Sequence, residues 1–203
     1  MRSWLQHVSL CAFIVLLCAR FSVGTDLESA KRAYHERDFP TAVKEFTVLA
    51  EQGNWEAQLI LGKMYMLGQG VPKDSDLAVK WFKPAAVHGD SEAQLLLGSL
   101  LFLPKKDIGE GLKWLRLSAD QGDQDAQLLL GKAYIKGFEE LPRDPVQGDM
   151  WLRLAAKDNK EFYQGELRGE ERGLTAEQIA KAKELAAVWK PKSSASSGTA
   201  STK

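Results

Sequence analysis

Few side chains in this sequence have the type and spacing that catalysis or metal binding requires. His35 and His88 lie far apart, and neither has a partner at metal-ligand spacing. Two carboxylate pairs, Asp74/Asp76 and Glu170-Glu171, have no neighbouring groups that would complete an acid–base pocket. The sequence contains no HExxH, no Gly-x-Ser-x-Gly and no phosphate-binding Walker loop. We therefore expect a protein that is not an enzyme and has no catalytic residues, no metal and no cofactor.

Two glycine-containing segments resemble functional motifs only in part. Gly68-Gln69-Gly70 lacks the third glycine of a dinucleotide-binding loop and follows a predicted helix, so it predicts a turn. Gly165, Gly169 and Gly173 have the four-residue spacing of membrane-helix dimers, but charged residues fill the intervals. We interpret this second segment as a hinge or loop.

The strongest pattern in the chain is an eight-residue phrase that occurs three times, at 56–63, 92–99 and 125–132. Its glycines are 36 and then 33 residues apart. A period in this range is typical of stacked helix pairs, because one pair cannot bury its apolar face alone. Such stacks present long surfaces to partners and seldom form catalytic pockets.

Each phrase opens the first helix of a pair. Apolar residues at helical spacing predict one buried face on each first helix, made of Ala57, Ile60, Leu61, Met64 and Tyr65, then Ala93, Leu96, Leu97, Leu100 and Leu101, then Ala126, Leu129, Leu130, Ala133 and Tyr134. Gly62, Gly98 and Gly131 sit in mid-helix, where glycine costs about 1 kcal/mol relative to alanine. We expect a neighbouring helix backbone to approach closely at these three glycines.

The second helices follow loops that carry proline, a basic residue and then aspartate. Asp74, Asp107 and Asp144 are predicted to cap these helices by accepting backbone N–H bonds. Each second helix has a small residue three positions before a tryptophan, at Ala78/Trp81, Gly111/Trp114 and Gly148/Trp151. We interpret the indoles as packing residues; a tryptophan-lined ligand site is the alternative.

The repeat pattern sets the domain organisation. We predict a helix pair at 25–52, repeats at 53–88, 89–121 and 122–157, and capping helices at 158–190. Thr175 and Gln178 form a capping-box pattern that starts a last helix running to about Trp189. Residues 191–203 are rich in Ser, Ala, Thr and Gly, which predicts a disordered tail.

Residues 1–24 predict a secretory signal cleaved after Gly24, which would place the mature protein in the periplasm. The apolar run from Val8 to Ala19 is shorter than the about 20 residues of a membrane span. An uncleaved N-terminal anchor, a lipid anchor on Cys18 and secretion remain alternatives. Cys11 and Cys18 both lie in this segment, so cleavage would leave no cysteine for disulfides or zinc.

Charge gives no argument for nucleic acid or acidic membrane as the main partner. The chain has 27 basic and 27 acidic residues, and removal of residues 1–24 would lower the basic count to 25. The 179 residues that would remain suit one domain with a continuous core.

These motifs resemble the Sel-one-like repeat (SLR) family, a variant of tetratricopeptide-type helix pairs. The first repeat carries the whole signature from Ala57 to Gly89: Ala-Gln-x-x-Leu-Gly-x-x-Tyr, Gly-x-Gly-Val-Pro-Lys-Asp, Ala-x-x-Trp-Phe and Ala-Ala-x-x-Gly. In the second repeat Leu101 replaces the tyrosine, and the third loses the closing glycine. The resemblance implies an all-α, right-handed solenoid of antiparallel helix pairs, and an adaptor or scaffold role that in exported bacterial members often serves the cell envelope.

A second stripe on each first helix is a candidate partner-binding surface. By spacing it comprises Leu59, Lys63 and Met66, then Leu95, Ser99 and Phe102, then Leu128, Lys132 and Ile135. In the implied fold this stripe faces the concave side, where it suits an extended peptide or an amphipathic helix. Burial by adjacent helices is the alternative.

Our leading hypothesis from the sequence is a non-catalytic adaptor of the bacterial cell envelope that binds a protein or peptide and is monomeric in isolation. We expect no small-molecule substrate and no nucleic-acid partner. The alternative is a structural component of a larger envelope machine, such as a flagellar motor, a secretion complex or a polysaccharide-export complex.

Overall fold

The computed structural model describes residues 26–104, 106–158 and 160–193, and within them the chain is all-α. No β-strand occurs in these ranges; Phe138 and Leu141 form one isolated bridge. The helices are α2 (Leu27–His35), α3 (Phe39–Glu51), α4 (Trp55–Leu67), α5 (Ser75–His88), α6 (Ser91–Phe102), α7 (Ile108–Gln121), α8 (Gln124–Lys136), α9 (Pro145–Ala155), α10 (Glu161–Glu171) and α11 (Ala176–Val188). The predicted signal segment, and the predicted tail beyond residue 193, lie outside the described residues.

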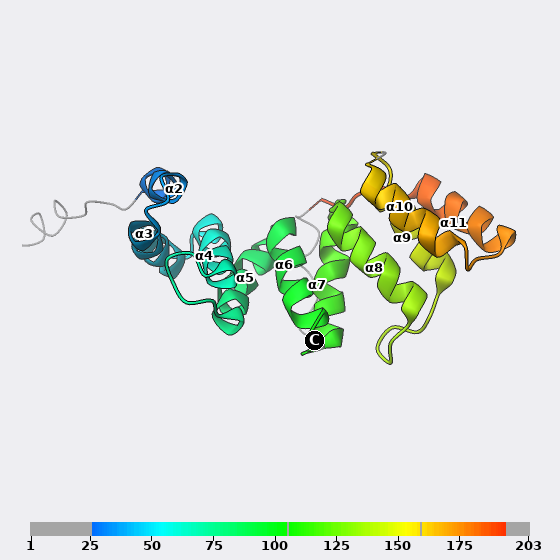
Figure 1. Ribbon diagram of the computed structural model, residues 1–203, viewed down its shortest axis with the longest axis horizontal. Helices are drawn as coiled ribbons and strands as arrows, with labels where there is room; N and C mark the ends of the chain where they lie inside the picture. Colours follow the sequence, from blue (N-terminus) through cyan, green and yellow to red (C-terminus); the bar gives the residue numbers. More distant parts are fainter. Residues whose placement is uncertain (1–25, 105, 159, 194–203) are drawn as a thin grey trace, which may run out of the picture.

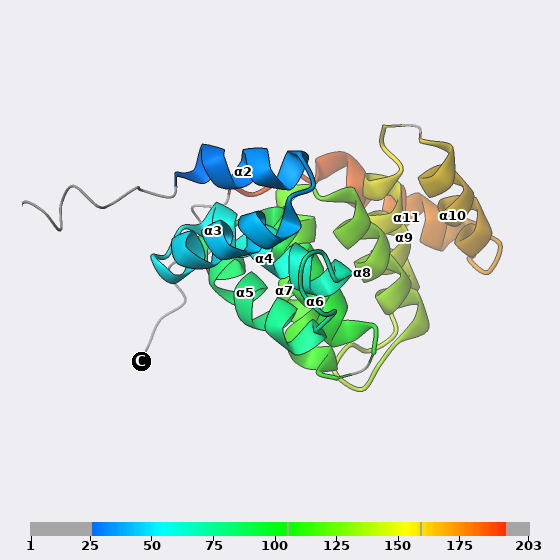
Figure 2. The ribbon, with the colours of Figure 1, turned by 60° about the vertical axis from the view of Figure 1, so that its left-hand side comes forward.

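The helices form a solenoid of successive pairs, as the repeat pattern predicts. Consecutive helices pack against each other from α2 through to α10. Figure 1 shows the pairs following one another from α2–α3 to α8–α9, and Figure 2 shows the same succession from the N-terminal side. The predicted all-α repeat fold is therefore confirmed.

Each helix of the three repeats begins at a side chain that caps it. The caps accept a backbone N–H two or three residues later, and they are Asn54, Asp74, Asp90, Asp107, Asp123 and Asp144. The capping role predicted for the three loop aspartates is confirmed. Thr175 and Gln178 likewise form the predicted capping box at the start of α11.

The glutamine of each repeated phrase joins one helix pair to the next. The Nε2 atoms of Gln58, Gln94 and Gln127 donate to carbonyls in the last turn of the preceding helix, at 3.0, 3.0 and 3.1 Å. These three side chains are buried, and a buried polar group without such a partner would be costly. The hydrogen bond therefore ties each new first helix to the last turn of the helix before it.

Within the second and third repeats, glycines let two helix backbones approach each other closely. A Cβ atom added at Gly98 would lie 2.9 Å from the backbone nitrogen of Leu115 and 3.0 Å from the carbonyl oxygen of Gly111. At Gly131 it would lie 2.9 Å from the carbonyl oxygen of Gly148. Real Cβ atoms do not tolerate such distances to backbone, so the predicted close approach is confirmed at both glycines.

In the first repeat an aromatic side chain, and not backbone, lies nearest to the mid-helix glycine. A Cβ atom added at Gly62 would meet the ring of Phe82 at 2.6 Å, and none of its three nearest atoms belongs to backbone. Alanine replaces glycine at position 78 of α5, and the fully buried Phe82 ring fills the gap. The expected backbone contact is therefore wrong for Gly62, where an aromatic ring takes the place of the neighbouring backbone.

The repeated tryptophans are packing residues. Trp114 and Trp151 are 7 and 2 % exposed and lie in the hydrophobic core, and Trp81 is half-buried against the N-terminal core cluster. The indole nitrogen of Trp114 donates to Glu110 Oε1 at 3.3 Å, four residues earlier on α7. The structure thus agrees with the packing interpretation of these indoles.

The segment that the glycine spacing suggested as a hinge or loop is largely helical. Gly165 and Gly169 lie within α10, and a Cβ atom added at either would meet nothing within 4 Å. The Nε2 atom of Gln164 donates to the Ala156 carbonyl at 2.7 Å, in the same way as the three repeat glutamines. This hydrogen bond and the burial of Leu167 against α9 hold the helix in place despite its glycines.

The last helix turns back onto α9 instead of pairing with α10. Ala182, which is fully buried, lies in one core cluster with Met150, Trp151 and Leu154 of α9. The ring of Trp189 meets that of Trp151 edge to face, with centroids 6.0 Å apart. The end of the stack is thus covered by a helix that does not continue the repeat.

The glycine contact predicts opposite effects for two similar substitutions. Gly131→Ala should lower the free energy of unfolding by about 1–3 kcal/mol, because the new methyl group must push two helices apart. Gly165→Ala, the matched control in open space, should raise it by up to about 1 kcal/mol. Urea denaturation measures both values, and stabilisation by Gly131→Ala would contradict the close approach.

The glutamine hydrogen bond gives a second prediction. Gln127→Met should lower the free energy of unfolding by about 1 kcal/mol, because the Ala119 carbonyl loses a buried donor. Gln52→Met changes an exposed glutamine and should stay within about 0.5 kcal/mol of the wild type. Thermal or urea denaturation of both variants tests the claim, and equal effects would refute it.

Candidate functional site

The first helices of the three repeats share one exposed surface. Four positions on each helix, spaced four, three and four residues apart, are half-buried or exposed. We call these positions the outer line: Glu56, Ile60, Lys63 and Leu67 on α4; Glu92, Leu96, Ser99 and Leu103 on α6, Leu103 being its C-cap; and Asp125, Leu129, Lys132 and Lys136 on α8. On each helix the line starts with an acidic residue, followed by an apolar one. The residue types at the third and fourth positions differ between the repeats.

The predicted partner-binding stripe lies partly on this surface and partly beneath it. Lys63, Ser99 and Lys132 are on the outer line. Leu59, Phe102 and Leu128 are only 6, 8 and 7 % exposed and belong to core clusters. Met66, Leu95 and Ile135 are half-buried and pack against the same clusters.

Adjacent helices thus take up most of the apolar part of that stripe. Leu128 and Ile135, for example, pack under α10 together with Leu167. The apolar residues of the outer line are instead the next ones in sequence, Ile60, Leu96 and Leu129. The spacing had assigned these three to the core face. A partner-binding role for the stripe remains a prediction, and the buried members can contribute only as support from below.

Ion pairs connect neighbouring first helices along the outer line. The Nζ atom of Lys63 lies 2.7 Å from Glu92 Oε1, and that of Lys132 lies 2.5 Å from Glu166 Oε2 on α10. Before the repeats, Lys31 and Glu56 form the same kind of pair at 2.6 Å, and hydrogen bonding to Glu56 raises the pKa of Lys31. These pairs are partly exposed, so each contributes at most about 1 kcal/mol.

The series of ion pairs is interrupted between α6 and α8. Ser99 occupies the position that lysine holds in the other two repeats, and a serine hydroxyl cannot make the corresponding ion pair. Asp125, the acidic residue at the equivalent place on α8, instead accepts a hydrogen bond from the Tyr163 hydroxyl at 2.7 Å. Burial and this carboxylate raise the pKa of Tyr163 to about 12. Among the described residues, no ion pair therefore crosses this junction on the first-helix side.

An apolar hollow of about 190 Å³ opens at the same junction. We call it the α6/α8 hollow; it is lined by Phe102, Leu103, Leu129, Lys132, Ala133, Lys136 and Phe138. The rings of Phe102 and Phe138 meet edge to face at 5.2 Å, and the Lys136 ammonium lies 5.3 Å from the Phe138 ring. Leu103 is 61 % exposed at its rim.

Among the described residues no group of three or more His, Cys, Asp or Glu side chains could hold a metal ion. His88 stacks on Trp55 with ring centroids 5.0 Å apart, and His35 meets Tyr34 edge to face. No helix in the described part of the chain has the length and apolar character of a membrane span.

Comparison with known proteins identifies the repeats. The model of the Sel1 repeat family matches residues 55–90, 91–123 and 124–160, which together make up more than half of the chain. Proteins built from Sel1 repeats are generally non-catalytic and mediate protein–protein interaction. No curated protein matches the chain.

Several solved structures have the same fold. A Sel1 repeat protein from Oxalobacter formigenes is 24% identical over 70% of this chain and 59% of its own, with a TM-score of 0.63. The uropathogenic Escherichia coli protein c5321, a protective antigen with an SLR fold, is 29% identical over 72% of this chain and 40% of its own, with a TM-score of 0.51. MamA is 20% identical over 80% of this chain and 91% of its own, with a TM-score of 0.54.

The chain therefore spans about three fifths of the Oxalobacter protein and two fifths of the Escherichia coli protein. The three repeat matches, the capped helix pairs and these structural neighbours agree with one another. This chain belongs to the Sel1 repeat family.

Proposed function

We propose that the protein is an adaptor that binds a protein partner along the outer line, with the α6/α8 hollow as the anchor. Support comes from the interruption between α6 and α8. Lysine–glutamate pairs cross the junctions on either side, from α4 to α6 and from α8 to α10. At the α6–α8 junction Ser99 makes no such pair, and an apolar hollow opens between the C-terminal parts of these two helices. An apolar side chain of a partner would gain more by entering this hollow than by lying elsewhere on the line.

The size and charge of the hollow define the chemistry of the partner. At about 190 Å³ it is smaller than the roughly 300–1,000 Å³ of typical small-molecule pockets, and it suits one large apolar side chain. Lys132 and Lys136 stand at its edge, and Lys136 has no ion pair among the described residues. We therefore propose a peptide or helix with an apolar anchor residue flanked by carboxylates.

The cellular setting is part of the same proposal. Residues 1–24 have the pattern of a secretory signal, which supports an exported, periplasmic adaptor of the cell envelope. A structural component of a larger envelope machine is the alternative. The two differ in solution: an adaptor should be recovered as a soluble monomer, whereas a machine component should sediment with the envelope.

A substitution at the rim of the α6/α8 hollow tests whether the hollow anchors the partner. A photoreactive residue at Lys136 in the source cells, followed by mass spectrometry, identifies the partner. With that partner purified, Leu103→Asp should weaken its binding at least tenfold, because a carboxylate at the rim faces the partner's own carboxylates. Leu103 is largely exposed, so the fold should stay within about 0.5 kcal/mol of the wild type.

The matched control is Val87→Asp, an equally exposed apolar residue on the second helix α5. It should leave the affinity unchanged within twofold. Equal affinities of the two variants, measured by titration calorimetry, would show that the hollow is not the anchor.

A further inference from the structure

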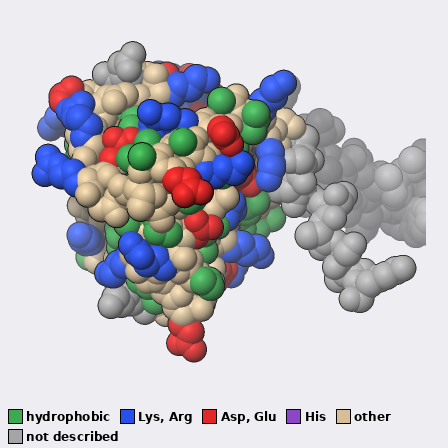
Figure 3. Space-filling model, turned by 90° about the vertical axis from the view of Figure 1, so that its right-hand side faces the viewer, with side chains coloured by type: hydrophobic (Ala, Val, Ile, Leu, Met, Phe, Trp, Pro, Cys, Tyr) green, Lys and Arg blue, Asp and Glu red, His purple; other side chains and the backbone are tan. Residues whose placement is uncertain are grey.

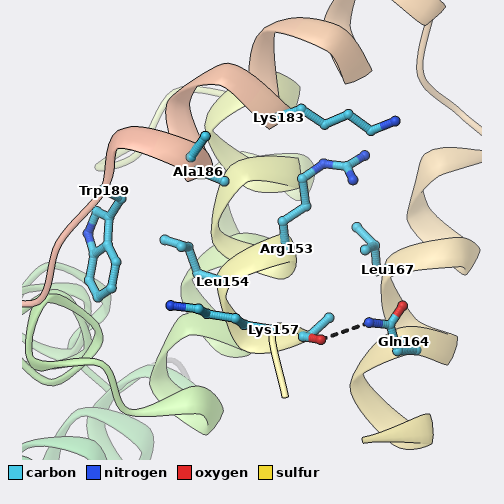
Figure 4. A pocket seen from close by; sticks show the side chains of 10 residues that line it. Arg153, Leu154, Lys157, Gln164, Leu167, Lys183, Ala186 and Trp189 are labelled. Carbon is cyan, nitrogen blue, oxygen red and sulfur yellow. Dashed lines mark hydrogen bonds between the residues drawn. The ribbon is translucent and has the colours of Figure 1, made fainter. Parts of the chain in front are cut away.

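A second and larger cleft lies at the C-terminal end, between α9, α10 and α11 (Figure 4). Its volume is about 460 Å³, within the usual range of ligand pockets. We call it the C-terminal cleft; its walls include Arg153, Leu154, Lys157, Leu167, Lys183 and Trp189. It shares no residue with the α6/α8 hollow.

The cleft exists because α10 starts a fourth repeat that is not completed. Gln164 makes the hydrogen bond typical of a first helix, but α11 packs against α9 and leaves one side of α10 without a partner. Arg168 stands four residues after Gln164, where the repeats have glycine. An arginine there prevents the close approach that a second helix makes elsewhere in the stack. A second helix that completed a fourth repeat would therefore not fit against α10 in this cleft.

Three cationic side chains face this cleft. Lys157 and Lys183 are exposed, and neither forms an ion pair within the described residues. The Nε atom of Arg153 donates to Asp149 Oδ2 at 2.9 Å, and its Nη2 atom donates to Glu171. No described residue accepts from its Nη1 atom. Asp149 and Glu171 thus hold the guanidinium in one orientation and leave three of its five N–H donors without a partner among the described residues.

Asp149 is unusual in being a fully buried carboxylate. The equivalent residues of α5 and α7 are Val79 and Leu112. Burial raises the pKa of Asp149, while Arg153 opposes the rise, and Oδ1 has no hydrogen-bond partner. An apolar residue here would pack without this penalty, so the carboxylate is better explained by its hold on Arg153 than by stability.

The cations are spread along an apolar wall. In Figure 4 the side chains of Arg153 and Lys183 extend side by side, whereas the Lys157 ammonium points toward the Trp189 end. Leu154, Leu167, Ala186 and Trp189 supply the apolar surface. A ligand that uses the whole cleft must therefore place negative charge at two separated points, with apolar atoms between them.

The surroundings exclude a broad basic surface as the explanation. Figure 3 looks onto the end of the molecule that bears α10 and α11, and it shows Lys and Arg scattered among Asp, Glu and hydrophobic side chains. Such a mixed surface lacks the one-sign field typical of binding to nucleic acid or to an anionic membrane.

We propose that the C-terminal cleft binds an acidic peptide segment of a partner, in which an apolar side chain lies between carboxylates. One carboxylate pairs with Arg153 and Lys183, and another pairs with Lys157. The apolar side chain lies against Leu154 and Trp189. This second site would let one adaptor hold two segments at once, one in each pocket.

A labelled peptide tests the assignment on the purified full-length chain. Fluorescence anisotropy should show saturable binding of an end-blocked Glu-Glu-Leu-Glu-Glu peptide. Binding should be at least tenfold weaker for Gln-Gln-Leu-Gln-Gln, which lacks the charges, and for Glu-Glu-Ser-Glu-Glu, which lacks the apolar anchor. No saturable binding, or equal binding of all three peptides, would overturn the proposal.

Variants locate the site on the protein. The double variant Lys157→Gln/Lys183→Gln should weaken binding roughly tenfold or more. Ala187→Trp, which fills the cleft and keeps its charges, should do the same. The control Lys44→Gln/Lys181→Gln removes the same charge from exposed residues outside the cleft and should change affinity less than twofold.

If both double variants weakened peptide binding equally, the loss would reflect the net charge of the protein. That result would refute the assignment of the peptide to the cleft. Because the α6/α8 hollow is proposed to take the same chemistry, the peptide is also titrated against Leu103→Asp. Binding that persists in Leu103→Asp and is lost in Lys157→Gln/Lys183→Gln belongs to the C-terminal cleft, whereas the reverse pattern assigns the peptide to the hollow and overturns this proposal. Circular dichroism of each variant confirms that the helices are retained.

Discussion

The structure depends on how closely two helices can approach within each pair. At Gly98 and Gly131 the backbones themselves are in contact, and at Gly62 a phenylalanine ring fills the same space. Glycine is costly in mid-helix, and at these three positions the cost is explained because an added side chain would collide with the neighbouring helix. Close packing at these positions holds the two helices of a pair together. The buried glutamine of each phrase then joins the next pair to the last turn of the helix before it. The remaining surfaces follow from these two constraints.

Much of the fold can be predicted from the sequence because its signals are local. Helix caps, the repeat period and the glycine positions each depend on a few neighbouring residues. Whether backbone or an aromatic ring lies against Gly62 depends instead on Ala78 and Phe82 of α5. That contact can be seen only once the two helices are packed together. The hinge or loop expected from Gly165, Gly169 and Gly173 was wrong for a related reason, since Leu167 and the Gln164 hydrogen bond hold α10 in place despite its glycines.

The candidate surface was harder to predict than the fold. The first helices are apolar around most of their circumference because they pack between neighbours on two sides, so periodicity cannot single out the exposed line. Leu59 and Ile60 are adjacent and chemically alike, yet one is buried and the other half-buried. The C-terminal cleft gave no sequence signal at all: Arg153, Gln164 and Lys183 meet only because α11 folds back onto α9.

The backbone contact within a pair can be observed directly by nuclear magnetic resonance. The account predicts a strong nuclear Overhauser effect between a Gly98 Hα and the Leu115 amide proton, because an added Cβ at Gly98 would lie 2.9 Å from that nitrogen. For Gly62 it predicts an Hα resonance shifted by the ring current of Phe82. Absence of the Gly98 cross-peak in a protein with intact helices would contradict the close pairing on which the stack rests.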